Sequence, residues 1–355
     1  MKKAGILIVD DESMIVDSIR DLIEFGSDYE VFAATSPFDA LKILDQKSVH
    51  VIISDFLMPE MNGIEFLLEA KKKVPSASLI LITGYADKES ALRAINEVGI
   101  YSYMEKPWDN EALLLTIKNA VERGTLLLQL QKSLRETRRA YVAAIYRLAT
   151  TSEMFDDDTF SHVLRIARLS EKLAELSGED RDFCFNIKYA SMMHDVGKIG
   201  VPKEILNKKG KLSDEEFDIV KKHPLVGSLI LKNPENPLME MAREIALFHH
   251  EKYDGKGYTQ GLKGETIPKS ARIVAVADVF DALLSERPYK PPFPPEKVRA
   301  IFSGEKGRHF DPELSGILLD NFDLFLQIYH DTSRIETENL SDILFHIDAE
   351  NRNQF

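Results

Sequence analysis

The feature that most constrains the fold is a regular alternation over residues 4–122. Five short apolar runs are separated by stretches in which apolar residues recur at helical spacing. The runs are Gly5–Val9, Val31–Ala34, Val49–Ser54, Leu79–Thr83 and Tyr101–Met104. Alternating strands and helices predict a parallel sheet covered on both faces, with its ligand site at the carboxyl ends of the strands. We therefore expect an α/β doubly wound domain over residues 1–122.

The rest of the chain has a helical pattern. Residues 123–150 lack proline and predict a long helix that joins the two domains, with heptad-like spacing at Leu127, Leu130, Leu134, Tyr141, Ala144 and Leu148. This connector is either an ordinary amphipathic helix or a coiled coil that makes the protein a homodimer. Residues 151–330 predict an all-α domain, and residues 331–355 are a polar tail to which we assign no function.

Composition excludes several classes of protein. The formal net charge of −13 argues against binding to nucleic-acid polymers or to anionic membranes. Cys184 is the only cysteine, so an intrachain disulfide and a zinc–thiolate site are both excluded. No apolar stretch approaches the roughly 20 residues that span a bilayer, and the short apolar run near the N-terminus ends in acids. We expect a cytoplasmic protein without a membrane segment.

Polar residues follow the predicted strands of the first domain. Asp10 and Asp11 follow the first, Asp55 the third, Thr83 closes the fourth and Lys106 follows the fifth. Carboxylates that converge at one sheet edge repel one another unless a hard dication lies between them. A carboxylate can also act as a nucleophile toward phosphorus, and a lysine and a hydroxyl can bind the transferred phosphoryl group. The alternative is an acidic loop edge with capping aspartates.

Residues 4–122 resemble a response-regulator receiver domain, whose fold is flavodoxin-like. The resemblance implies that Asp55 is the phospho-acceptor and that a sensor histidine kinase is the partner. It implies Mg²⁺ binding by Asp11, Asp55 and the backbone of Leu57, assisted by Asp10. Thr83 and Tyr103, together with Lys106, match the residues that switch the domain on phosphorylation.

Histidines concentrate in the second domain. Five of the nine lie between His162 and His250, and Asp195 and Asp278 accompany them. Imidazole and carboxylate donors without thiolates favour iron, manganese or zinc. The alternative is a set of histidines satisfied by hydrogen bonds within the core.

Two stretches, His194–Pro202 and His249–Thr259, resemble the HD-GYP branch of the HD superfamily of metal-dependent phosphohydrolases. The likeness extends over about residues 143–318 and includes Ala277–Leu283 and Arg287–Lys290. It implies hydrolysis of cyclic di-GMP to linear pGpG, GMP or both, with two or three divalent metals, iron or manganese first. The implied metal ligands are His162, His194, Asp195, His223, His249, His250 and Asp278.

The resemblance also implies roles within the site. Asp195 would bridge two metals, and Asp195 and Lys198 would be catalytic. Lys198, Arg287 and Lys290 would contact the substrate phosphate, where positive charge stabilises developing oxyanions. We expect Asp281 to support the helix that carries Asp278.

Two positions depart from the family pattern. Thr259 replaces the final proline of the motif, which puts the position of the loop and its protein partners in doubt rather than the metal ligands. Asp158 stands four residues before His162, where some members carry a glutamate that helps to bind a third metal. Aspartate is one methylene shorter, so both two and three metals remain open.

These expectations combine into a two-component response regulator that hydrolyses cyclic di-GMP under the control of Asp55 phosphorylation. Two alternatives remain. One is a phosphodiesterase for another cyclic dinucleotide, cyclic GMP-AMP. The other is a catalytically weak signalling adaptor that binds protein partners through the receiver domain and the loop around Tyr258.

Overall fold

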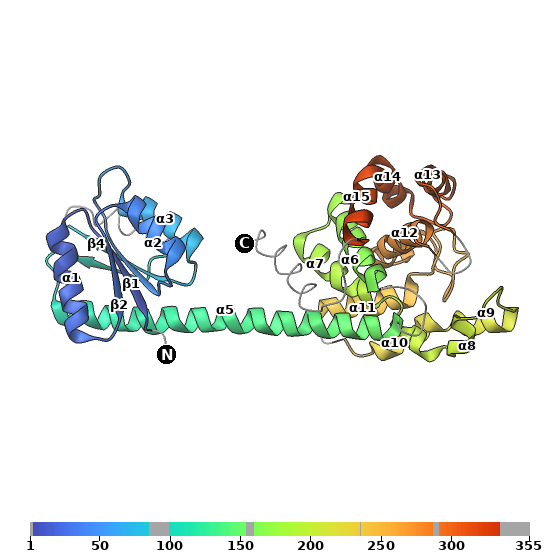
Figure 1. The fold of residues 1–355 in the computed structure, drawn as a ribbon, viewed down its shortest axis with the longest axis horizontal. Coiled ribbons are helices and arrows are strands. Elements are labelled where there is room, and N and C mark those ends of the chain that lie inside the picture. Colours follow the sequence, from blue (N-terminus) through green and yellow to red (C-terminus); the bar gives the residue numbers. More distant parts are fainter. Residues whose placement is uncertain (1–2, 85–98, 154–159, 235, 287–290, 334–355) are drawn as a thin grey trace. The chain divides into compact units, whose positions relative to one another are not determined.

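The structure is a computed structural model that describes residues 3–84, 99–153, 160–234, 236–286 and 291–333 (Figure 1). The chain divides into two compact units, Met1–Thr137 and Arg138–Phe355. The division falls within helix α5 (Asn110–Glu153), which covers the whole predicted connector. The expected boundaries at residues 122 and 150 stay predictions.

The first unit contains a parallel sheet of five strands in the order β2-β1-β3-β4-β5. The strands are β1 (Gly5–Val9), β2 (Glu30–Ala34), β3 (Val51–Asp55), β4 (Ser78–Thr83) and β5 (Ser102–Glu105). The α/β doubly wound fold is therefore confirmed. The observed strands begin and end within two residues of the predicted runs, and β3 ends on Asp55 itself.

Alternate residues of each strand face opposite sides of the sheet. Leu7 and Val9 pack with α2 (Pro37–Gln46) and α3 (Gly63–Lys73), whereas Ile6 and Ile8 pack with α1 (Ser13–Gly26) and the start of α5 (Figure 1). Because helices cover both faces, the strands read as continuous apolar runs rather than as an alternating pattern. Polar side chains are left to the loops at the strand ends.

The second unit is helical, as predicted. Its α-helices are α6 (Phe160–Leu176), α7 (Arg181–Ala190), α8 (Lys203–Leu206), α9 (Asp214–Val220), α10 (His223–Ile230), α11 (Pro237–Phe248), α12 (Lys269–Leu284), α13 (Pro295–Gly304), α14 (Pro312–Asp320) and α15 (Phe322–Ser333). Short 3₁₀ turns lie at η2 (Ser191–Met193), η3 (Val196–Gly200) and η4 (Gly264–Thr266). Helix α6 packs against α7, α12 and α15, and this core carries the candidate metal site.

No helix in the described ranges combines the length and the apolar character that crossing a membrane requires.

Candidate metal centre and phospho-acceptor site

Three predicted residues of the first unit meet at the carboxyl edge of the sheet. Lys106 Nζ lies 2.5 Å from Asp55 Oδ1 and 2.9 Å from Asp10 Oδ2. The backbone N–H of Leu57 donates to Asp55 Oδ2 at 2.9 Å. The Asp11 side chain is exposed beside Asp10. The ammonium group thus lies between two carboxylates that would otherwise repel each other.

Burial and charge pairing have opposite effects on the pKa values of Asp55 and Lys106. Burial is the largest effect on Asp55 and raises the pKa of its carboxyl, although the contact with Lys106 acts in the other direction. Burial alone would lower the pKa of Lys106, but its bonds to Asp55 and Asp10 outweigh this and raise it. The result is a partly desolvated carboxylate held by one ammonium, an arrangement suited to receiving a group that brings negative charge.

The other receiver residues surround this corner. Thr83 is buried at the end of β4, and its hydroxyl donates to the carbonyl of Gly84 at 3.2 Å. Tyr103 on β5 is half-buried against the core that α2 and α3 form. Gly63 begins α3 so close to Asp55 that a Cβ there would lie 2.0 Å from the Asp55 carbonyl oxygen. Only glycine therefore permits this approach of α3 to the acceptor loop.

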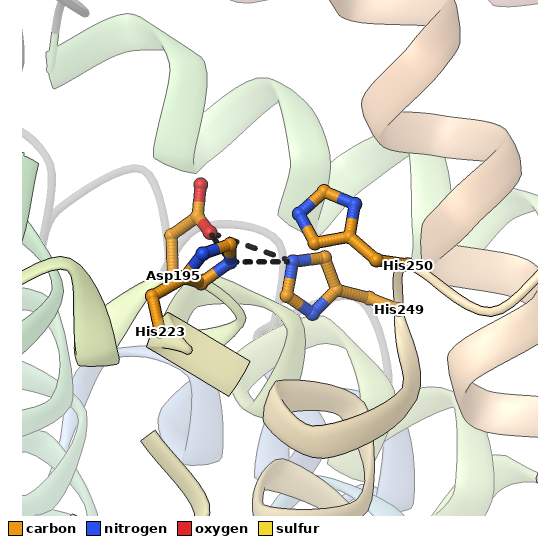
Figure 2. A group of neighbouring side chains, drawn as sticks. All are labelled: Asp195, His223, His249 and His250. Carbon is orange, nitrogen blue, oxygen red and sulfur yellow. Dashed lines mark hydrogen bonds and ion pairs between the residues drawn. The ribbon is translucent and has the colours of Figure 1, made fainter. Parts of the chain in front are cut away.

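In the second unit, four predicted ligands gather in one group (Figure 2). Asp195, His223, His249 and His250 each offer a donor atom, and these atoms lie within 4.8 Å of one another. Nε2 of His223 and Nε2 of His249 lie 3.1 and 3.4 Å from Asp195 Oδ1, and 3.5 Å from each other. Two imidazole nitrogens and a carboxylate oxygen therefore face a common point.

A second group lies beside the first. His162 on α6, His194 after η2 and Asp278 on α12 also offer donor atoms within 4.8 Å of one another. His194 Nε2 lies 3.3 Å from Asp195 Oδ2. One oxygen of Asp195 thus faces each group, which is the position required of a carboxylate that bridges two cations.

Local backbone geometry brings Asp195 and His223 together. Gly197 packs η3 against the start of α10, where a Cβ would lie 2.0 Å from the carbonyl oxygen of His223. Any larger residue would force η3 away from α10 and separate the two side chains. The glycine of the motif thus has a structural reason that spacing alone did not reveal.

The histidine rings are fixed in orientation. Nδ1 of His194, His223 and His249 lies 2.9, 2.8 and 3.0 Å from the carbonyl oxygens of Ser191, Val220 and Ile245. A carbonyl can only accept, so Nδ1 carries the proton and Nε2 presents its lone pair to the centre of the site. This is the arrangement typical of histidines that bind metals.

Protonation states also suit a metal. Burial lowers the pKa of His249, and it lowers the pKa of His250 well below the usual value, so both rings are neutral near pH 7. Burial acts to raise the pKa of Asp195, but the positive charge of Lys198 helps to hold it well below its usual range. Neutral imidazoles and an ionised carboxylate are the forms that coordinate a divalent cation.

Lys198 belongs to the site as well. Its Nζ lies 2.8 Å from Asp195 Oδ2, and its side chain is largely buried. The predicted residues Asp158, Arg287 and Lys290 lie outside the described residues.

Two supporting residues had no signal in the sequence. Arg165 on α6 pairs with Asp281, and Asp281 also contacts His162, so Asp281 supports a residue of α6 and not only its own helix. Glu251 is buried, and its Oε1 accepts from the N–H groups of Gln260 and Gly261 at 2.6 and 3.0 Å. It closes the loop that carries Tyr258.

Comparisons with known proteins agree with the predicted receiver domain and with the predicted HD domain. The family model of the response regulator receiver domain matches residues 6–118, and that of the HD domain matches residues 128–314. A cyclic di-GMP phosphodiesterase of Thermotoga maritima is 34% identical over 327 residues, which cover 87% of this chain and 88% of that protein. The cyclic di-GMP phosphodiesterase response regulator RpfG of Xanthomonas campestris is 35% identical over 330 residues, covering 89% and 87%.

A third relative matches over a shorter stretch of the chain. The 3'3'-cGAMP-specific phosphodiesterase 2 of Vibrio cholerae is 45% identical over 201 residues, which cover 57% of this chain and 38% of that protein. The receiver match, the HD match and the two relatives that align over most of their length lead to one assignment. The chain belongs to the family of response regulators that join a receiver domain to an HD domain of the HD-GYP type.

Proposed function

We propose that this protein hydrolyses cyclic di-GMP in its HD domain and that phosphorylation of Asp55 regulates the reaction. The observation that carries the proposal is Asp195, whose two oxygens face two groups of histidine and aspartate donors. The names of the Thermotoga and Xanthomonas relatives support cyclic di-GMP as the substrate.

The donors fit two divalent cations. We propose that His162, His194 and Asp278 bind one metal, that His223, His249 and His250 bind the other, and that Asp195 bridges them. Nitrogen and oxygen donors without sulfur suit iron, manganese or zinc, and the family resemblance favours iron or manganese among these. Two such metals would supply a hydroxide nucleophile at neutral pH and positive charge against the attacked phosphate. A third metal through Asp158 remains a proposal.

The side chains of the chain itself contribute orientation and charge. The Lys198 ammonium, 2.8 Å from Asp195, is close enough to the donor groups to donate to a non-bridging phosphate oxygen. The buried imidazoles keep their Nε2 atoms toward the centre of the site, because their Nδ1 atoms are bound to backbone carbonyls. We propose Arg287 and Lys290 as further contacts of the substrate phosphate.

In the receiver domain we propose Asp55 as the nucleophile toward a phosphoryl group from a sensor histidine kinase. Mg²⁺ would bind through Asp10, Asp11, Asp55 and the backbone of Leu57. The Lys106 ammonium would bind the new phosphoryl group, and the side chains of Thr83 and Tyr103 would change position when Asp55 is phosphorylated. The raised pKa of Asp55 supports this. Burial destabilises the charged form of the carboxylate, and both a bound cation and phosphorylation of the carboxylate relieve that cost.

We further propose that α5 joins two copies of the chain. Leu130, Leu134 and Leu148 continue one heptad stripe along this helix, and all three are exposed. Exposed leucines at this spacing are the surface that a coiled coil buries. The helix would then carry the state of the receiver to the HD domain.

A second candidate substrate is 3'3'-cGAMP. The Vibrio relative that is 45% identical over 201 residues is named as a phosphodiesterase specific for it. The two substrates share phosphates and ribose and differ in one base, so competition between them in a single assay discriminates the candidates.

The test is metal analysis and turnover on the same anaerobically purified sample, with and without phosphorylation. We expect about two or three metals per chain and hydrolysis of cyclic di-GMP. Asp195→Ala should abolish turnover, and Asp55→Asn should abolish only its response to the phosphodonor. A fully metallated protein that leaves cyclic di-GMP and 3'3'-cGAMP intact in both states would refute the proposal and favour an adaptor.

A further inference from the structure

An aromatic path leads from the histidine cluster to the surface. The Tyr258 ring stacks on the His250 ring, with centroids 4.8 Å apart and planes at 29°. Phe217 meets Tyr258 in an edge-to-face contact, with centroids 6.5 Å apart and planes at 79°. Phe217 is 44% exposed. One ring therefore separates an exposed phenylalanine from a candidate metal ligand.

Both rings are held in place. The backbone N–H of Tyr258 donates to the carbonyl of His250 at 3.2 Å. Phe217 lies on α9, which begins with a reciprocal cap between Ser213 and Glu216. Lys208 Nζ binds both oxygens of Glu216, at 2.7 and 2.6 Å, and so fastens α9 to the preceding loop. The short helix thus presents Phe217 in a defined position.

One ammonium group lies over the ring of Phe217, on a helix that is otherwise acidic, since α9 also carries Asp214, Glu215, Glu216 and Asp218. Lys221 Nζ lies 4.6 Å from the centroid of the Phe217 ring and 2.9 Å from Asp218. A single exposed phenylalanine is ordinary in a folded protein. Here, however, the exposed ring lies one ring away from His250 of the donor cluster and next to the Lys221 ammonium. A ligand with an aromatic group matches these features, and Lys221 offsets part of the acidic charge of α9.

We propose that Phe217, with Tyr258, is the surface on which one purine base of the dinucleotide stacks while its phosphodiester lies at the Asp195 cluster. The inference rests on the proposed function. A nucleobase is joined to its phosphate through one ribose, so a base must lie just outside the cluster when the phosphate is within it. Bases bind aromatic faces by stacking, largely irrespective of sequence. The role of Phe217 is to bind and position substrate.

The first test uses fluorescence, because Trp108 is the only tryptophan of the chain. In the full-length Trp108→Phe/Phe217→Trp variant, all indole emission comes from position 217. We expect cyclic di-GMP and GMP to quench this emission in stopped-flow mixing, before turnover, whereas ribose 5-phosphate does not. The matched control is Trp108→Phe/Leu229→Trp, since Leu229 on neighbouring α10 is 65% exposed and outside the aromatic path. Equal quenching at both positions, or none at 217, overturns the proposal.

The second test separates KM from kcat. Phe217→Ala should raise KM for cyclic di-GMP about ten-fold with kcat nearly unchanged, Phe217→Tyr should restore it, and Leu229→Ala should have no effect. An unchanged KM in Phe217→Ala also overturns the proposal. If the wild-type protein does not hydrolyse cyclic di-GMP but the nucleotide quenches the indole introduced at position 217, the proposed function fails and the stacking surface stands. If the protein turns over substrate without either effect, only the stacking surface fails.

Discussion

The Asp281 carboxylate lies 2.7 Å from Nδ1 of His162, across 119 residues of sequence. The same carboxylate binds Arg165, whose Nη2 lies 3.0 Å from Oδ2. Burial would raise the pKa of Asp281, but His162 and Arg165 outweigh it and lower the pKa to about 2. The carboxylate is therefore ionised and fixes the ring of His162 with Nε2 toward His194 and Asp278.

Asp281→Asn should weaken metal binding by the group of His162. The amide cannot keep the charge that pairs with Arg165 and orients the ring, and loss of such a partner costs about 10–100-fold in metal affinity. Mn²⁺ titration of the metal-free protein measures the effect. Of the two binding events, only one should become weaker in the variant. The control is Asp311→Asn, another buried aspartate that pairs with an arginine, Arg272, and that caps α14 instead of contacting a donor residue. Equal losses in both variants would show that the effect is general destabilisation.

The stability of the metal-free HD domain should fall with acid. His249 and His250 have pKa values below the unfolded value of about 6.5, so between the two values the unfolded chain binds protons that the folded chain does not. Stability is then fully present above about pH 6.5 and declines below it, by about 1.4 kcal/mol per pH unit for each histidine that stays neutral.

Calorimetry between pH 7.5 and 5.5 measures this decline. The unfolding transition of the HD domain is identified as the one that added Mn²⁺ shifts to higher temperature. His250→Gln removes one of the two histidines, so the slope of the free energy of unfolding against pH should fall by the contribution of that histidine. A stability that does not change over this range, or a slope unaltered in the variant, would contradict the assignment of neutral rings.

Trp108 should report phosphorylation of the receiver domain. It follows Lys106 by two residues, and Lys106 contacts both Asp55 and Asp10. A phosphoryl group on Asp55 would attract the Lys106 ammonium and disturb the adjoining backbone. We expect acetyl phosphate with Mg²⁺ to change the emission of the protein, with no change in Asp55→Asn. The same response in that variant would place the effect elsewhere.

The fold was accessible from sequence because each strand of a parallel sheet is buried on both faces and leaves a continuous apolar run. Residues at strand ends then meet by topology, as Asp55 and Lys106 do. The helical half offered no such rule. Helical periodicity gives the buried face of α6 and of α12 but not their relative rotation, so the contact between Asp281 and His162 could not be derived. The clamp of Glu251 on Gln260 depends on backbone N–H groups, which every sequence carries alike.

Thr259 should partly replace the missing proline of its motif. Its hydroxyl donates to the carbonyl of Leu247, near the end of α11, at 3.1 Å. This bond ties the loop of Tyr258 to the helix that leads into His249. Thr259→Val keeps the shape and removes the donor, which should cost about 1 kcal/mol of stability and raise KM for cyclic di-GMP. Thr259→Ser should behave as wild type in thermal unfolding and in turnover. Identical behaviour of the valine and serine variants would exclude this role of the hydroxyl.

Charge on the leucine stripe of α5 should separate the proposed dimer. Leu130 and Leu134 are 55% and 61% exposed and lie four residues apart on one face of the helix. In a coiled coil they would be buried, so Leu130→Glu/Leu134→Glu would place carboxylates in an apolar seam and oppose association. Leu115→Glu is the control, because Leu115 is 60% exposed on the same helix but outside the heptad stripe. Light scattering at micromolar concentration should give a dimer for the wild type and the control and a monomer for the double variant. A wild-type monomer, or a double variant that remains dimeric, would exclude the stripe as the interface.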